Sequence, residues 1–147
     1  MLTRLLILAG LIATLPAMAA ESGHKYIVNE RPGITTPLPF SDAVVTGNTL
    51  YIAGTLGLDP ATGQAPAEVK AEAQLLMDAV KKTVEKAGFT MNDVVSITVF
   101  CTDLKLYDTF NGVYRTYFGT QLPARAFIGA ATLLRGAHFE IQGIAVR

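Results

Sequence analysis

The 147-residue chain has little that could hold it together covalently or attract a polyanion. Its single cysteine cannot form a disulfide within the chain. Twelve basic and twelve acidic residues give a net charge of zero, which removes the diffuse attraction that nucleic-acid and membrane-surface binders use. Charged residues make up 16% of the chain, below the roughly 25% typical of soluble domains. Either part of the chain lies outside the folded domain, or the domain covers much of its surface.

Common site motifs are also missing. The sequence has no G-x-x-x-x-G-K-[ST] loop and no G-x-G-x-x-G turn, which argues against a cradle for phosphate or a dinucleotide. The two histidines, His24 and His138, lie far apart, and without an H-x-x-x-H or C-x-x-C pair the chain has few ligands for a metal. We expect His138 to be a solvated loop residue, with a proton shuttle as the alternative. We expect Cys101, at the end of an apolar strand, to be buried and inert rather than a reactive thiol.

The first 19 residues have the pattern of a secretory signal peptide. Arg4 supplies the positive start, Leu5–Leu15 is a nearly continuous apolar run, and Ala17-Met18-Ala19 is a small-residue cleavage site. The run is shorter than the about 20 apolar residues of a membrane span, and an uncleaved interfacial helix is the alternative. We expect cleavage near Ala19, a single mature domain over residues 20–147, a periplasmic or secreted protein, and no stable membrane anchor.

The mature chain alternates between strand and helix patterns. Apolar runs on either side of the Gly47-Asn48 turn predict a hairpin, and 3-4 spacing of apolar residues predicts two amphipathic helices. In the first helix the charged residues, Glu72 among them, fall outside the apolar stripe. The expected strands cover residues 26–28, 43–46, 49–58, 94–100, 126–131 and 139–146, and the expected helices cover residues 66–87 and 107–118.

This order of elements predicts an α+β domain with one mixed sheet. Each helix has one apolar face to bury, so both helices fit on the same side of the sheet. The other face of the sheet then needs a cover, and a chain of this size has no element left to supply one. A closed oligomer is the economical solution.

Two charged residues interrupt otherwise apolar strands. Arg125 lies at the start of one strand, and Glu140 lies inside the last strand on the same face as Ile144 and Val146. One interpretation is an Arg125–Glu140 ion pair that fixes the strand register, or plain solvation at a sheet edge. The other is a carboxylate-binding arginine beside an acid/base glutamate, together acting on water and a small anionic substrate.

Four segments carry a resemblance to a known family. In chain order they are Gly47-Asn48 with Gly54, Asp59-Pro60-Ala61-Thr62-Gly63, Leu122-Pro123-Ala124-Arg125-Ala126 and Glu140-Ile141-Gln142-Gly143-Ile144-Ala145-Val146. This pattern, from about residue 36 to the end, resembles the Rid family, the YjgF-like group of imine and enamine deaminases. The resemblance implies a chorismate-mutase-like fold, a homotrimer with clefts between subunits, and hydrolysis of 2-aminoacrylate-type acids to 2-keto acids and ammonia without a metal or organic cofactor.

The resemblance also implies roles for individual residues. Arg125 matches the arginine that grips the substrate carboxylate, and Glu140 matches the acid that holds the attacking water. Gly54 matches a glycine whose backbone contacts the ligand, and Asn111 matches a polar residue near the cleft. For Asn111, a partly exposed helix asparagine with no such role is the alternative.

Several positions depart from the family pattern. Phe40 stands where active members often have a tyrosine, Ala53 where a serine or threonine is frequent, and Phe127 where a cysteine is frequent. Gln142 replaces a frequent acidic residue. We expect these changes to make the cleft more apolar and smaller, which leaves the substrate range and the activity open.

Three functions fit these observations. The first is hydrolytic deamination of small imine acids. The second, suggested by the signal peptide, is a periplasmic binding or protective module that holds a small carboxylate without turnover. The third is RNA cleavage, as in some relatives, which fits a near-neutral chain poorly, so that we expect no nucleic-acid partner.

Overall fold

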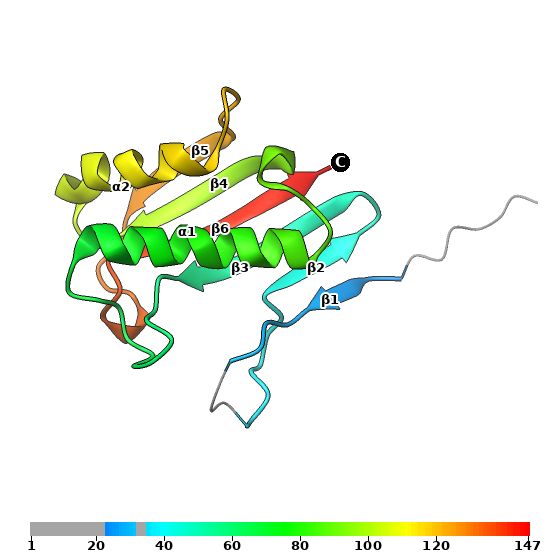
Figure 1. Ribbon diagram of the computed structural model, residues 1–147, viewed down its shortest axis with the longest axis horizontal. Helices are drawn as coiled ribbons and strands as arrows, with labels where there is room; N and C mark the ends of the chain where they lie inside the picture. Colours follow the sequence, from blue (N-terminus) through cyan, green and yellow to red (C-terminus); the bar gives the residue numbers. More distant parts are fainter. Residues whose placement is uncertain (1–22, 32–34) are drawn as a thin grey trace, which may run out of the picture.

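The computed structural model describes residues 23–31 and 35–147, and the predicted signal peptide lies outside this part. One sheet contains six strands in the order β1-β2-β3-β6-β4-β5, in which β4 and β5 are parallel and the other neighbours are antiparallel (Figure 1). The strands are β1 (Lys25–Ile27), β2 (Ala43–Thr46), β3 (Thr49–Leu56), β4 (Val94–Cys101), β5 (Ala124–Gly129) and β6 (Phe139–Val146).

Two α-helices, α1 (Val69–Lys86) and α2 (Tyr107–Tyr114), lie side by side on the same face of the sheet (Figure 1). The mixed sheet with both helices on one side is therefore confirmed. No helix in the described part of the chain is long and apolar enough to cross a membrane.

Element boundaries differ from expectation for local reasons. Helix α1 begins at Val69 because the side chain of Glu68 caps it, accepting from the backbone N–H groups of Lys70 and Ala71 at 3.0 and 2.6 Å. The second helix changes after Tyr114 into a 3₁₀ turn, Arg115–Tyr117. Strand β5 begins two residues early and ends at Gly129, because it pairs in parallel with Ser96–Cys101 of β4.

Smaller shifts affect the first three strands. Strand β1 covers Lys25–Ile27 rather than residues 26–28, and β3 ends at Leu56 rather than at residue 58. The hairpin around Gly47-Asn48 is confirmed, with Thr46 paired to Thr49 and Gly47 at a φ of 57°.

The hydrophobic core lies between the sheet and the two helices. Alternation in β6 is as expected, since Phe139, Ile141 and Ala145 are fully buried in it. Cys101 is buried as well, and its thiol donates to the carbonyl of Asp103 at 3.0 Å. Other buried members include Leu50, Ile52, Leu76, Met77, Val80, Val84, Ile97, Val99 and Phe110.

Glu72 was expected outside the buried stripe of α1, and this prediction is wrong. Its side chain is completely buried because it accepts hydrogen bonds from His138 and Phe139 at the start of β6. The expectation for His138 is corrected by the same contacts, since its imidazole bonds to the buried carboxylate and is only about one-third exposed.

The opposite face of the sheet carries no helix in the described residues, and we call it the open face (Figure 1). One row across it runs through Val44, Tyr51, Ile144 and Ser96 as successive cross-strand partners. Each of these side chains is partly or largely exposed, and Tyr51 is 51% exposed. Within the described residues this face of the sheet is therefore left uncovered, as expected.

Candidate active site

Arg125 lies at the edge of the sheet, at the end of a buried row. Successive cross-strand partners Ile52, Gly143, Ile97 and Arg125 lead from the middle of the sheet to β5. Ile97 is 1% exposed and lies under the helices, so its partner Arg125 is on the helix-covered face as well. A charged side chain therefore lies at the point where this buried row reaches the edge strand β5.

Helix α2 holds the guanidinium in place. Arg125 Nη2 donates to Asn111 Oδ1 at 2.8 Å and to the Tyr107 hydroxyl at 3.4 Å. The guanidinium carbon also lies over the ring of Tyr114, 4.6 Å from its centre, and 5.6 Å from the centres of Tyr107 and Phe127. Within residues 23–31 and 35–147, the salt bridges do not include Arg125, so its positive charge is not neutralised by a carboxylate there.

Aromatic rings surround this arginine more closely than the sequence suggested. Phe127 is half-buried and packs edge-on against Tyr107 and Phe110, with ring centres 5.0 and 5.6 Å apart. Phe127 therefore supports the arginine from the core side. Sequence reasoning missed Tyr107 and Tyr114 as neighbours of Arg125, although their spacing from Asn111, i−4 and i+3, puts all three on one helix face.

Glu140 lies on the other face of the sheet. Its cross-strand partners are Leu56 in β3 and Phe100 in β4, and both are only partly buried. Its carboxylate lies directly against Gly54, where a Cβ atom would come 2.1 Å from Glu140 Oε1. The glycine and the glutamate are thus brought together as the resemblance implied.

The predicted Arg125–Glu140 ion pair is wrong within one chain. Arg125 pairs with Ile97 and Glu140 pairs with Phe100, and these two residues of β4 are three positions apart, so they face opposite sides of the sheet. No register shift separates them in either ladder. Within one chain, the sheet therefore separates the two charged side chains.

Ala53 is the neighbour of Gly54 in β3. The backbone N–H of Ala53 donates to the carbonyl of Asp42 at 2.9 Å, which ties β3 to the segment that follows Phe40. The Phe40 ring is 51% exposed. Gly54 and Glu140 thus belong to the open face, whereas Arg125, Asn111 and Phe127 belong to the α2 edge.

Burial changes the acidity of two groups near these elements. Burial raises the pKa of Tyr114 to about 12, and the positive charge of Arg125 opposes this shift. Burial also raises the pKa of the Cys101 thiol, so that the reactive thiolate is disfavoured at neutral pH.

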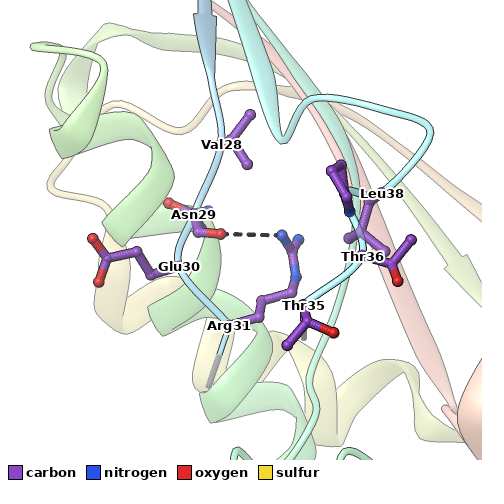
Figure 2. A pocket seen from close by; sticks show the side chains of 8 residues that line it. Val28, Asn29, Glu30, Arg31, Thr35, Thr36 and Leu38 are labelled. Atoms are coloured by element: carbon purple, nitrogen blue, oxygen red, sulfur yellow. Dashed lines mark hydrogen bonds between the residues drawn. The ribbon is translucent and has the colours of Figure 1, made fainter. Parts of the chain in front are cut away.

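A separate hollow of about 520 Å³ lies inside the loop between β1 and β2, lined by Val28–Arg31 and Thr35–Leu38 (Figure 2). Arg31 points into it, but its guanidinium bonds to the Asp42 carboxylate and to the carbonyl of Asn29. The charge is therefore already neutralised, and none of the predicted site residues lines this hollow.

Comparison with known proteins identifies the family of the chain. The family described as Endoribonuclease L-PSP matches residues 32–147. The 2-iminobutanoate/2-iminopropanoate deaminase of Mus musculus is 42% identical over 110 residues, which cover 74% of this chain and 82% of the mouse protein.

Solved structures show the same fold. The crystal structure of the YjgF gene product from Escherichia coli has a TM-score of 0.74 and 36% identity, and the match covers 84% of this chain and 98% of that one. Escherichia coli TdcF with bound serine has a TM-score of 0.75 and 32% identity, covering 84% and 99%. The chain belongs to the Endoribonuclease L-PSP family, the YjgF-like or Rid group, which includes proteins named as 2-iminobutanoate/2-iminopropanoate deaminases.

Proposed function

We propose that this protein hydrolyses small imine and enamine acids of the 2-aminoacrylate type to 2-keto acids and ammonia. One observation carries the proposal: a positively charged arginine with no carboxylate partner in the described residues is held rigidly at the sheet edge. A guanidinium in this state is suited to bind a substrate carboxylate. The relatives named as deaminases support the same reaction class.

Arg125 binds and orients the substrate in this proposal. Both of its hydrogen bonds within the described residues use Nη2, so the N–H groups of Nε and Nη1 are left as donors for the substrate carboxylate. Asn111 and Tyr107 accept hydrogen bonds from the guanidinium group, and the rings of Tyr114 and Phe127 lie against it. A small carboxylate ligand also agrees with the serine bound to the Escherichia coli relative.

Glu140 accepts and donates the protons of the reaction in this proposal. The enamine first tautomerises to its imine, and the oxygen of a water molecule then attacks the imine carbon while Glu140 accepts one proton from the water. Glu140 passes this proton to the imine nitrogen, so that the tetrahedral carbon carries a hydroxyl and an amine. Glu140 then accepts the hydroxyl proton as the C=O bond forms and delivers it to the amine nitrogen as the C–N bond breaks, so that ammonia leaves. The balance is imine plus water to keto acid plus ammonia.

The cleft in this proposal forms between subunits of a homotrimer. Arg125 and Glu140 face opposite sides of one sheet, so a complete site takes the arginine from one subunit and the glutamate from another. A ring of three copies also covers the open face, which includes Tyr51 and Ile144.

The first test is a coupled assay of keto-acid release from enzymatically generated 2-aminoacrylate. Wild type is expected to exceed the buffer rate. Arg125→Ala is expected to lose activity mainly through KM and Glu140→Ala mainly through kcat, because the first binds substrate and the second acts in the chemical step. If wild type and Arg125→Ala both match buffer, the deaminase proposal fails. Tight keto-acid binding by an inactive wild type would indicate a binding module instead.

The second test mixes two inactive variants. When Arg125→Ala and Glu140→Ala subunits are unfolded and refolded together, a cleft with arginine from one variant and glutamate from the other is intact. Random assembly of three subunits restores about one quarter of the wild-type clefts, and therefore about one quarter of the activity. If each site were built within one chain, the mixture would stay inactive.

We also propose that the protein acts after export, because the first 19 residues carry the signal-peptide pattern. The mass of the protein recovered from a periplasmic or secreted fraction is expected to correspond to a chain that begins near residue 20. Recovery of the uncleaved chain in the membrane fraction would contradict this.

A further inference from the structure

A buried carboxylate that the proposed reaction does not use lies beneath the end of the sheet that carries Glu140. Glu72, in the first turn of α1, has no exposed surface. Burying an ionised carboxylate is expensive unless donors surround it. Here Glu72 Oε1 accepts from the backbone N–H groups of His138 at 2.6 Å and Phe139 at 2.9 Å, and Oε2 lies 2.7 Å from His138 Nδ1.

The third contact of the carboxylate is with the imidazole. In the tautomer that carries its hydrogen on Nδ1, the His138 ring donates this bond to Glu72 Oε2. The backbone of His138 is held from a second side, since its carbonyl accepts from the N–H of Thr102 at 3.0 Å. Helix α1 and the end of β4 together fix the point at which β6 begins.

Glu140 is the next residue after this fixed point. Its cross-strand partner Leu56 is followed by Gly57, which packs so tightly against α1 that a Cβ there would lie 2.2 Å from the Glu72 carbonyl oxygen. The first turn of α1 therefore contacts two points beside Glu140. Its main chain packs against Gly57, the residue after β3, and the buried Glu72 side chain bonds to the start of β6, the strand that carries Glu140.

We propose that Glu72 is a positioning residue for Glu140, acting through the backbone of His138 and Phe139. The proposal rests on the proposed function, in which Glu140 holds the attacking water. Removing the acceptor at Glu72 would free two backbone N–H groups beside Glu140 and allow the start of β6 to move. A displacement of about 1 Å at a catalytic group is enough to lower kcat roughly 100-fold.

The experiment compares three variants in the deaminase assay. Glu72→Ala is expected to lower kcat by roughly 10- to 100-fold and to leave KM within about twofold of wild type. Glu72→Gln keeps an acceptor for both N–H groups and is expected to retain most of the activity. Thr83→Ala is the matched control, because Thr83 is also a buried polar residue of α1, bonded to Asn29, but lies about 16 Å further along the helix.

A double-mutant cycle separates positioning from general destabilisation. If Glu72 acts through Glu140, Glu72→Ala has little further effect on kcat once Glu140→Gln is present. An equal fall in kcat in both backgrounds, an equal fall in Thr83→Ala, or full activity in folded Glu72→Ala would overturn the proposal. If Glu72→Ala does not fold, Glu72→Met replaces it, since methionine has a similar volume but accepts no backbone hydrogen bond.

A readout without turnover keeps this proposal distinct from the proposed function. With the Glu140 side chain labelled, its carboxyl ¹³C resonance at fixed pH is expected to shift in Glu72→Ala and to stay unchanged in Thr83→Ala. Inactive wild-type protein with this shift would remove the deaminase proposal and retain the positioning. An unchanged resonance would remove the positioning whatever the activity.

Discussion

The two faces of the sheet are made by the same strands but differ in what one chain completes. On the helix-covered face, Leu50, Val99 and Ile141 have no exposed surface. On the open face, their neighbours in sequence are partly or largely exposed, and Tyr51, next to Leu50, is 51% exposed. The helix-covered face forms a packed core, whereas no helix packs against the open face in the described residues.

The candidate site follows the same division. Arg125 belongs to the covered face and is held by α2, whereas Glu140 belongs to the open face and lies against Gly54. The guanidinium of Arg125 is held within one chain by two hydrogen-bond partners and three rings. In the proposed function, the Glu140 carboxylate needs a second subunit opposite it. The covered face therefore stabilises the single chain and carries one half of the proposed site, while the open face carries the other half and the surface proposed for assembly.

The largest effect is expected from a charge on the open face. Ile144→Lys places an ammonium between Tyr51 and Ser96, where burial against another subunit would leave it without a partner. We expect complete loss of assembly in light scattering and loss of deaminase activity. The circular dichroism of helix and sheet is expected to persist, because the core on the covered face is intact.

Gln74→Lys is the control for that variant. It adds the same charge on the exposed side of α1, and we expect assembly and activity like those of wild type. If Ile144→Lys assembled normally, the open face would not be the subunit interface. If it unfolded, the covered face would not be sufficient to hold one chain together.

Much of the covered face could be predicted from the sequence. Alternation in the last strand separated the face of Glu140 and Ile144 from the face that the structure buries, and 3-4 spacing identified the helices, because both signals come from local periodicity. Helix ends were less predictable. The capping side chain of Glu68 shortened α1, and such a cap is one contact rather than a repeated pattern.

The site was less predictable because it depends on register between strands. Alternation placed Glu140 on a face, but only the pairings of Arg125 with Ile97 and of Glu140 with Phe100 show that the two charges lie on opposite faces. Glu72 illustrates the same limit. Its position in α1 indicated a solvated residue, and the donors that bury it lie 66 and 67 residues further along the chain.

An intermediate effect is expected when a methyl group is added on each face. Gly57→Ala puts its Cβ 2.2 Å from the backbone carbonyl of Glu72, which cannot move without shifting α1, so we expect a loss of about 1–3 kcal/mol in denaturant unfolding. Gly54→Ala meets the flexible end of Glu140, which can rotate away. We expect a loss below about 1 kcal/mol but a fall in kcat of at least roughly tenfold.

The outcome of this pair depends on the division between faces. A Gly54→Ala protein that loses more stability than Gly57→Ala would show that the open face also stabilises the single chain. A fully active Gly54→Ala protein would mean that the Glu140 carboxylate does not need its position against this glycine.

The smallest effect concerns Tyr114, a buried side chain of α2 on the helix-covered side of the sheet. Its hydroxyl is buried and has no hydrogen-bond partner in the part of the chain that the structure describes. Burial raises the pKa of Tyr114 from 10.0 to about 12 in the folded protein. Between these values the unfolded state loses its proton first, so folding stability falls as pH rises from about 10 to about 12. Tyr114→Phe is expected to make this alkaline loss shallower in denaturant unfolding.

Tyr117 provides the matched comparison at neutral pH. Burial and the nearby Asp78 raise its pKa to about 12 as well, but its hydroxyl donates to Asp78 Oδ1 at 2.7 Å. Tyr117→Phe therefore loses a hydrogen bond and is expected to cost about 0.5–1.5 kcal/mol, whereas Tyr114→Phe is expected to be neutral or stabilising by up to about 1 kcal/mol. If Tyr114→Phe cost more than Tyr117→Phe, the Tyr114 hydroxyl would have a partner in solution, and a second subunit or a bound ligand beside Arg125 would have to supply it.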